Sequence, residues 1–195
     1  MDASRITSDD TSRVSLAIGF GVALIVIVGI CYLVFVGISA KKEVTGFDPN
    51  RPIPSNDVLR KRLKAEQYRI TRENGTETPF HNDFWDNARV GIYADVITGE
   101  PLFLSYDKFD QSTGQLTFTK PISPDLLVEK QDLSHNMQRT EIRARRSDAH
   151  VGHVFADPTS PTGKRYSVNS AAFRFIPIDK LQAMGYEQYR PLLNR

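Results

Sequence analysis

The chain has 195 residues, 40% of them hydrophobic and 25% charged, which is enough for one small domain with an appended segment. A net charge of +2, with no long basic block, argues against a nucleic-acid partner. Cys31 is the single cysteine, so internal disulfides and cysteine-based zinc sites are excluded.

The first strong feature along the chain is an apolar segment, Ser15–Ile38, which follows a polar tail over residues 1–14. Its 24 residues carry no charge and would span about 36 Å as a helix, enough to cross a bilayer. It exceeds the apolar core of a signal peptide, lacks a clean cleavage site and has no polar face. We predict an uncleaved transmembrane helix in an integral, single-pass protein of a bacterial inner membrane. Basic residues flank both ends, so the side on which the domain lies stays open.

A linker and then a folded domain are predicted after this helix. Residues 39–55 contain three prolines and one glycine with little apolar pattern, which indicates a semi-extended linker. The domain is predicted over residues 56–195. Its first element is a short helix over Asn56–Gln67, because Leu59 and Leu63 recur at helical spacing.

From Tyr68 onward, short apolar runs separated by turn residues predict strands. The Asn-Gly pair in YRITRENGTE is typical of a turn between strands, and the alternation in RTEIRARR predicts an exposed antiparallel strand. AHVGHVFAD and KRYSVNSAAFRFIP predict two further strands. The tail DKLQAMGYEQYRPLLNR is expected to begin as a short helix and then to lie along the domain or to contact a partner. The pattern predicts a single, mostly antiparallel domain.

Several blocks in this region match one family in order. They read YRITRENGTETPF, GIY, TGEPLF, KFD, SHNMQRTEIR, AHVGHVF, PTG-RY and NSAAFRFIP. Together they resemble the B-type methionine-R-sulfoxide reductases over residues 59–193. The resemblance implies a mostly β fold of two antiparallel sheets. It also implies a reaction in which a thiolate attacks the sulfoxide sulfur and a second thiol resolves the resulting sulfenic acid.

The residues at the thiol positions differ from the family pattern. The nucleophile position is Ser167, and a frequent resolving position is Thr113. Gln115 stands where the family has a tryptophan that packs on the substrate methyl group. A serine hydroxyl is hardly ionised at neutral pH, and its oxygen cannot pass through a sulfenate–disulfide cycle. We therefore predict a pseudoenzyme.

The family's structural zinc is also not expected. Its two cysteine pairs fall at four residues that are poor zinc ligands, and one of them, an alanine, has no ligand atom. These residues are Asp95, Thr98, Ala144 and Ser147. We expect no metal and no other cofactor.

Four residues fall at the family's pocket positions, namely His150, His153, Asn169 and Phe175. They form either a preserved pocket for a sulfoxide or a set of internal contacts that hold the sheets. Ser167 and the two histidines also resemble the catalytic residues of a hydrolase, but the sequence has no nucleophile-elbow motif. The resemblance further covers residues that we interpret as scaffold: Asp132, His135, Arg139, Glu141 and Arg165.

The leading functional hypothesis is a non-catalytic, membrane-anchored domain that serves as an accessory subunit of a larger membrane complex, for example a respiratory or photosynthetic one. Its expected partners are the membrane and other membrane-protein subunits. The alternatives are a membrane-bound peptide-methionine (R)-S-oxide reductase and a sensor that binds methionine sulfoxide without turnover.

Overall fold

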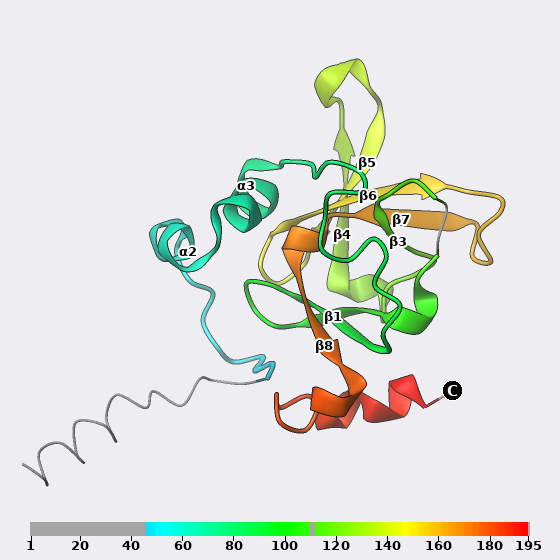
Figure 1. The fold of residues 1–195 in the computed structure, drawn as a ribbon. Coiled ribbons are helices and arrows are strands. Elements are labelled where there is room, and N and C mark those ends of the chain that lie inside the picture. Colours follow the sequence, from blue (N-terminus) through cyan, green and yellow to red (C-terminus); the bar gives the residue numbers. More distant parts are fainter. Residues whose placement is uncertain (1–45, 110–111, 195) are drawn as a thin grey trace, which may run out of the picture. The chain divides into compact units, whose positions relative to one another are not determined.

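The computed structural model describes residues 46–109 and 112–194 (Figure 1). The predicted membrane helix, Ser15–Ile38, and the tail before it lie outside the described residues. Within the described part of the chain, no helix is long and apolar enough to cross a membrane.

Two helices open the domain, α2 (Asn56–Arg62) and α3 (Ala65–Glu73). The predicted helix is therefore broken after α2, and the strand expected from Tyr68 is wrong. Tyr68 and Ile70 belong to α3, and their side chains are buried. Asn74 adopts a left-handed conformation at φ 54°, so the Asn-Gly pair ends a helix here instead of turning a hairpin.

The strands form two antiparallel sheets, which confirms the predicted mostly β fold. One sheet has the order β2-β1-β8 and the other has the order β3-β7-β6-β5-β4. The strands are β1 (Gly91–Asp95), β2 (Pro101–Leu104), β3 (Leu116–Phe118), β4 (Leu127–Asp132), β5 (Arg139–Ala144), β6 (His150–Ala156), β7 (Lys164–Val168) and β8 (Phe173–Pro177).

Two strand predictions need correction. β5 lies between β4 and β6, and its Ile142 and Ala144 are fully buried, so it is not an exposed strand. The single strand expected over 164–177 is interrupted by a 3₁₀ turn, Ser170–Ala172, which carries the chain from β7 in one sheet to β8 in the other. The buried Glu77 holds this turn, because its carboxylate accepts hydrogen bonds from the N–H groups of Ser170 and Ala171.

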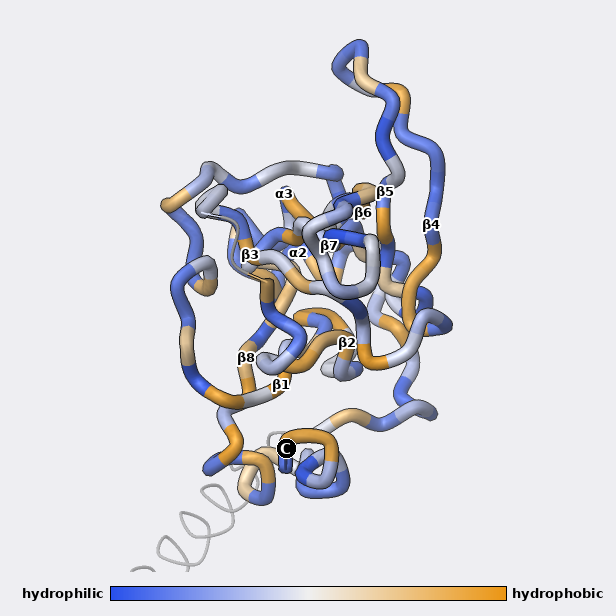
Figure 2. Tube along the Cα trace, turned by 90° about the vertical axis from the view of Figure 1, so that its right-hand side faces the viewer, coloured by the Kyte–Doolittle hydropathy of each residue, from blue (hydrophilic) through white to orange (hydrophobic). Residues whose placement is uncertain are grey.

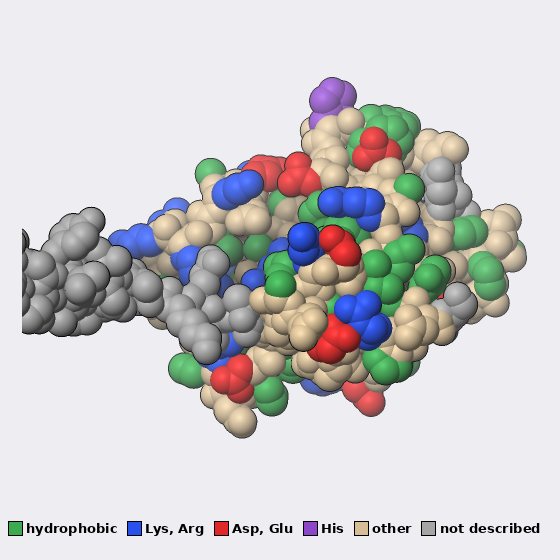
Figure 3. Space-filling model, turned by 60° about the horizontal axis from the view of Figure 1, so that its bottom comes forward, with side chains coloured by type: hydrophobic (Ala, Val, Ile, Leu, Met, Phe, Trp, Pro, Cys, Tyr) green, Lys and Arg blue, Asp and Glu red, His purple; other side chains and the backbone are tan. Residues whose placement is uncertain are grey.

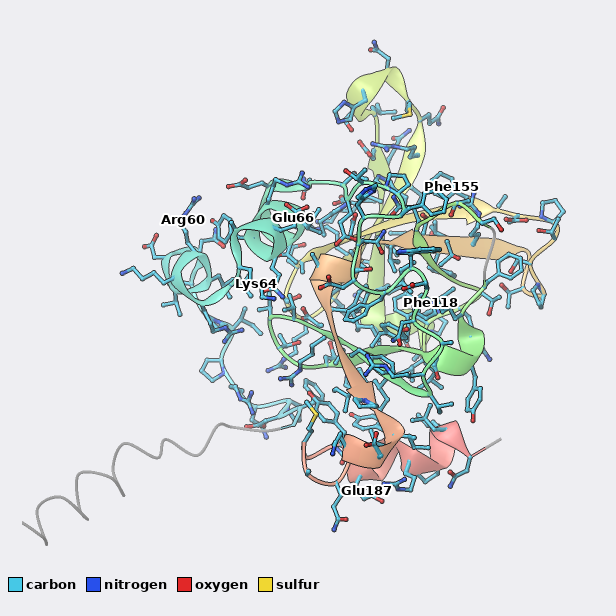
Figure 4. The ribbon with its side chains drawn as sticks, in the orientation of Figure 1. Arg60, Lys64, Glu66, Phe118, Phe155 and Glu187 are labelled. Atoms are coloured by element: carbon cyan, nitrogen blue, oxygen red, sulfur yellow. The ribbon has the colours of Figure 1, made fainter. Side chains whose placement is uncertain are left out.

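The core lies between the sheets and is rich in aromatic rings. Phe103 stacks on Phe118 at 4.5 Å between ring centroids, and Tyr93 meets Phe118 edge-on at 5.1 Å. Figure 4 labels Phe118 in the interior, and Figure 2 shows apolar chain gathered along β1, β2 and β8. Tyr166 and Val168 of β7 face this core, so Ser167 between them faces outward.

A second apolar cluster covers the other face of the three-stranded sheet. The C-terminal tail supplies Tyr186 and Leu193, both buried, so these residues of the tail pack on their own domain. Phe47 packs on the same cluster, and Arg146 donates a hydrogen bond to the carbonyl of Arg51 at 2.6 Å. Residues 46–51, which were predicted as linker, therefore contact the domain. On the face drawn in Figure 3, Lys and Arg side chains are interspersed with Asp and Glu.

Candidate functional site

Strand register places Ser167 second in a row of five side chains across the five-stranded sheet. Thr117 of β3 pairs with Ser167, and Ser167 pairs with His153 of β6. The row continues through Glu141 of β5 to Lys130 of β4. Because side chains alternate along each strand, these residues share the outer face of the sheet.

A bulge in β5–β6 pairing brings His150 onto the same face. The register shifts between Ile142 and Arg143, so His150 pairs with Arg143 and its ring centroid lies 5.5 Å from that of His153. Between the two histidines, Gly152 lets β6 lie close to β7, since a Cβ there would lie 2.2 Å from the carbonyl oxygen of Ser167.

Each histidine is held by a carboxylate. His150 Nδ1 lies 2.7 Å from Glu141 Oε1, and His153 Nε2 lies 2.7 Å from Asp132 Oδ2. Arg139 donates to the same oxygen of Asp132 at 2.7 Å. Hydrogen bonds from Ser134, followed by that from His153, keep the pKa of Asp132 well below its usual range. Residues that the sequence indicated only as scaffold therefore orient the two rings.

His150 is the more deeply buried of the two histidines. Its side chain is only 2% exposed, and burial lowers the pKa of the imidazole, although Glu141 opposes the shift. The ring is therefore neutral at pH 7, and Nδ1–H donates to Glu141, which leaves Nε2 as an acceptor. Nε2 is buried and has no hydrogen-bond partner among the described residues.

A pocket of about 310 Å³ opens over the histidines. It is lined from three sides: His150 and His153 on the sheet, the end of α3, and the connection between β4 and β5. That connection belongs to a hairpin that projects beyond the rest of the domain in Figures 1 and 2. Nearby on the same face, the guanidinium of Arg165 lies 4.9 Å from the ring centroid of Phe155, which Figure 4 labels.

The remaining predicted pocket residues are used elsewhere. Asn169 accepts from the N–H of Glu77 at 3.0 Å and donates to the carbonyl of Val151 at 3.2 Å, so its side chain joins two segments. Gln115 donates to the carbonyl of Glu77 at 3.1 Å. Thr113 is exposed, and Phe175, in the other sheet, packs 4.9 Å from Tyr93.

Among the described residues, Ser167 has no hydrogen-bonded base that would activate it for hydrolysis. His153 contacts Asp132 through Nε2, and the described part of the chain shows no hydrogen bond between Ser167 and His153 despite their strand pairing. Sequence analysis did not identify Glu77. Its carboxylate accepts hydrogen bonds from the N–H groups of Ser170 and Ala171, which lie 93 and 94 positions further along the chain. Only long-range contact reveals that role.

The chemistry of the four predicted former zinc positions does not fit zinc. Asp95 accepts a hydrogen bond from the Thr98 hydroxyl at 2.6 Å, and burial raises the pKa of its carboxyl although the Thr98 and Ser147 hydroxyls oppose the shift. Ala144 offers no ligand atom. A structural zinc site takes four nitrogen, sulfur or carboxylate ligands, and this set supplies one carboxylate that is already hydrogen-bonded.

Comparison with known proteins identifies a family model and a named relative that this chain resembles. A family model described as the SelR domain matches residues 63–177. The peptide methionine sulfoxide reductase MsrA/MsrB of Vibrio cholerae serotype O1 is 49% identical over 139 residues, which are 71% of this chain and 37% of the relative. The chain thus spans little more than a third of the length of that relative. The family match covers the blocks on which the family resemblance rests.

Proposed function

This chain belongs to the SelR family of B-type methionine-R-sulfoxide reductases, and we propose that it is a member without a catalytic thiol, acting as a membrane-anchored binding module of a larger complex. The observation that carries this proposal is Ser167 between Thr117 and His153 in this row, in a domain whose sequence contains no cysteine.

The chemical argument concerns the first step of reduction. A thiolate sulfur can attack the sulfoxide sulfur, become a sulfenic acid and be reduced again through a disulfide. The Ser167 hydroxyl can do neither step, because it stays protonated at neutral pH and oxygen has no corresponding redox states. Gln115 adds to this difference, since its amide is turned to the carbonyl of Glu77.

The pocket supports binding by the domain. The His150–Glu141 and His153–Asp132 pairs are retained around a volume of about 310 Å³. A buried imidazole nitrogen without a partner costs free energy unless a ligand or water satisfies it. His150 Nε2 is such a nitrogen, and it would accept a hydrogen bond from a peptide N–H. Because the chain belongs to the SelR family, the ligand that we favour is an oxidised methionine in a partner protein, whose peptide N–H would donate to this nitrogen.

A reductase assay on the full-length protein in mild detergent tests the missing step. With a methionine-R-sulfoxide peptide and dithiothreitol, we expect no turnover by the protein as it stands. Ser167→Cys is the matched variant, because it restores only the thiol, and turnover confined to it would assign the loss to this position. Turnover by the unmodified protein above that of a His150→Ala/His153→Ala control would overturn the proposal.

Two further measurements address binding and assembly. Saturable binding of the sulfoxide peptide that is lost in His150→Ala supports recognition without reduction. Purification from native membranes should yield other membrane-protein subunits at a fixed ratio. A lone protein in that purification would remove the accessory-subunit role, which rests on the apolar segment Ser15–Ile38.

An active reductase is the second candidate. The name of the Vibrio cholerae relative supports it, because that protein is 49% identical and is called a peptide methionine sulfoxide reductase. For this chain it would require a nucleophile other than residue 167. The same assay separates the two proposals.

A further inference from the structure

The positive charge of the chain comes from residues 51–64, the segment that contains α2. This segment holds five Lys or Arg residues and one Asp, a balance of +4, whereas the whole chain has a net charge of +2. The rest of the chain therefore carries a balance of −2. A surface of this sign favours contact with negatively charged groups. The five basic residues are Arg51, Arg60, Lys61, Arg62 and Lys64.

α2 presents this charge from a fixed position at the margin of the domain (Figure 1). Leu59 of α2 and Leu63, the residue after it, are buried, and Arg62 donates a hydrogen bond to a carbonyl in the turn after β1. Helical side chains three residues apart share a face, so Val58 and Lys61 lie together. Both are exposed, on the side of α2 that faces away from the buried leucines.

Neighbouring carboxylates neutralise little of this charge. Lys61 and Lys64 are exposed and form no ion pair with another residue in the described part of the chain. Arg60 lies 3.5 Å from Glu73, but both side chains are exposed, so the pair is weak. The guanidinium of Arg60 also lies 4.3 Å from the ring centroid of Tyr68, which fixes its direction. Figure 4 labels Arg60 and Lys64 on this part of the domain.

Two large apolar side chains are exposed beside the basic residues. Ile53 is 40% exposed and Val58 is 50% exposed. Ile53 and Arg62 line the same small depression in the surface. Exposed apolar side chains among Lys and Arg are typical of segments that lie in a membrane interface. There the apolar groups enter the boundary of the acyl chains and the basic groups meet lipid phosphates.

The length of chain before the domain keeps this surface near a bilayer. With the apolar segment Ser15–Ile38 in the membrane, as proposed above, only residues 39–45 separate it from Gly46, where the described domain begins. Seven residues span at most about 25 Å when fully extended. A surface held this close meets lipid at a high effective concentration, so a few weak contacts suffice to hold it there.

We propose that residues 51–64 form a lipid-contact surface that binds the headgroups of anionic phospholipids. Its exposed basic side chains meet the phosphates, and Ile53 and Val58 enter the interfacial layer. α2 stays on the domain during this contact, because Leu59 is part of the core. The proposal rests on the membrane anchor of the proposed function. It adds a second attachment, which fixes the orientation of the domain at the bilayer.

A fluorophore at residue 58 tests this contact in the full-length protein embedded in lipid nanodiscs. Val58→Cys in a Cys31→Ser background carries the only thiol, and a lipid with a quencher at headgroup level reports its approach to the bilayer. We expect quenching with phosphatidylglycerol present and little with phosphatidylcholine alone. About 0.5 M NaCl should reverse the quenching, because the Debye length falls to about 4 Å. The same label on Leu133→Cys, exposed in the β4–β5 connection, should stay unquenched.

Charge variants then assign the quenching to the basic side chains. Lys61→Gln/Lys64→Gln should lower the ratio of lipid-bound to free surface about 25-fold, because each basic residue near anionic lipid is worth about fivefold. Lys130→Gln/Lys164→Gln is the matched control, because it removes the same charge from exposed side chains of the five-stranded sheet. It should change the ratio by less than about twofold. A label at residue 58 that stays unquenched in anionic nanodiscs, or is quenched equally in neutral ones, would overturn the proposal.

Extraction with alkaline carbonate separates this result from the fate of the proposed function. A protein that stays in the bilayer while residue 58 remains unquenched would keep its anchor and lose this contact. Release into solution would refute the anchor and, with it, the contact. A cross-link from residue 58 to another protein of native membranes, without quenching by lipid, would assign the surface to a partner subunit and would also overturn the proposal.

Discussion

Glu77 is the residue whose removal should disturb the site region most without touching the histidines. Its carboxylate accepts hydrogen bonds from the N–H groups of Ser170 and Ala171. Its own N–H donates a hydrogen bond to Asn169 Oδ1. Burial raises the pKa of Glu77, while those two backbone N–H groups oppose the shift. In Glu77→Ala both N–H groups lose their partner in a buried turn. At about 1–3 kcal/mol for each of the two stranded donors, the free energy of unfolding should fall by about 2–6 kcal/mol.

The assay is urea unfolding of the full-length protein in mild detergent, followed by the fluorescence of the single tryptophan, Trp85. Glu77→Gln keeps one carbonyl acceptor and should lose about half as much. Glu66→Ala is the control, because Glu66 forms an exposed pair with Arg69 at 2.5 Å that is worth about 0.5 kcal/mol or less. A Glu77→Ala protein within about 1 kcal/mol of the unmodified one would refute this account of the turn.

Three further outcomes follow from the site. Gly152→Ala should lose about 3 kcal/mol in the same unfolding assay, because the new Cβ would meet the Ser167 carbonyl at 2.2 Å. Gly163→Ala should lose only about 1 kcal/mol, since that position has open space and only its positive φ is strained; equal losses would contradict the steric argument. Burial lowers the pKa of His150 below its ordinary value of 6.5, so the unfolded chain binds the proton first as pH falls. Stability should therefore decrease from pH 7 through 6.5 toward the folded pKa, and a His150→Asn protein with an unchanged slope of stability against pH would contradict this.

The sequence predicted the sheets better than the elements that lead into them. The ordered blocks between 68 and 177 indicated two antiparallel sheets because several motifs agreed. The segment from Tyr68 was mistaken for a strand because an Asn-Gly pair is typical of hairpins and also of helix ends, and only the burial of Tyr68 and Ile70 on a helical face decides between them.

The site residues that lie within one motif could be predicted from the sequence. Those that depend on the register of strand pairing could not. His150 and His153 were identified because they fall at the family's pocket positions, within the single block AHVGHVF. Their carboxylate partners come from β4 and β5, and the bulge that aligns them is a property of strand pairing. Glu77 carries no spacing signal at all, because its contacts lie in a turn far along the chain.

The packing of residues 46–51 on the C-terminal tail has a mechanical consequence. Gly46 lies so close to Gly185 that an added Cβ would stand 2.6 Å from the carbonyl oxygen of Gly185, and Arg146 fastens the carbonyl of Arg51. The chain enters the domain where its tail is docked. A force applied to the chain at Gly46 would act first on these contacts. The strands of either sheet would bear the force only after the contacts had broken.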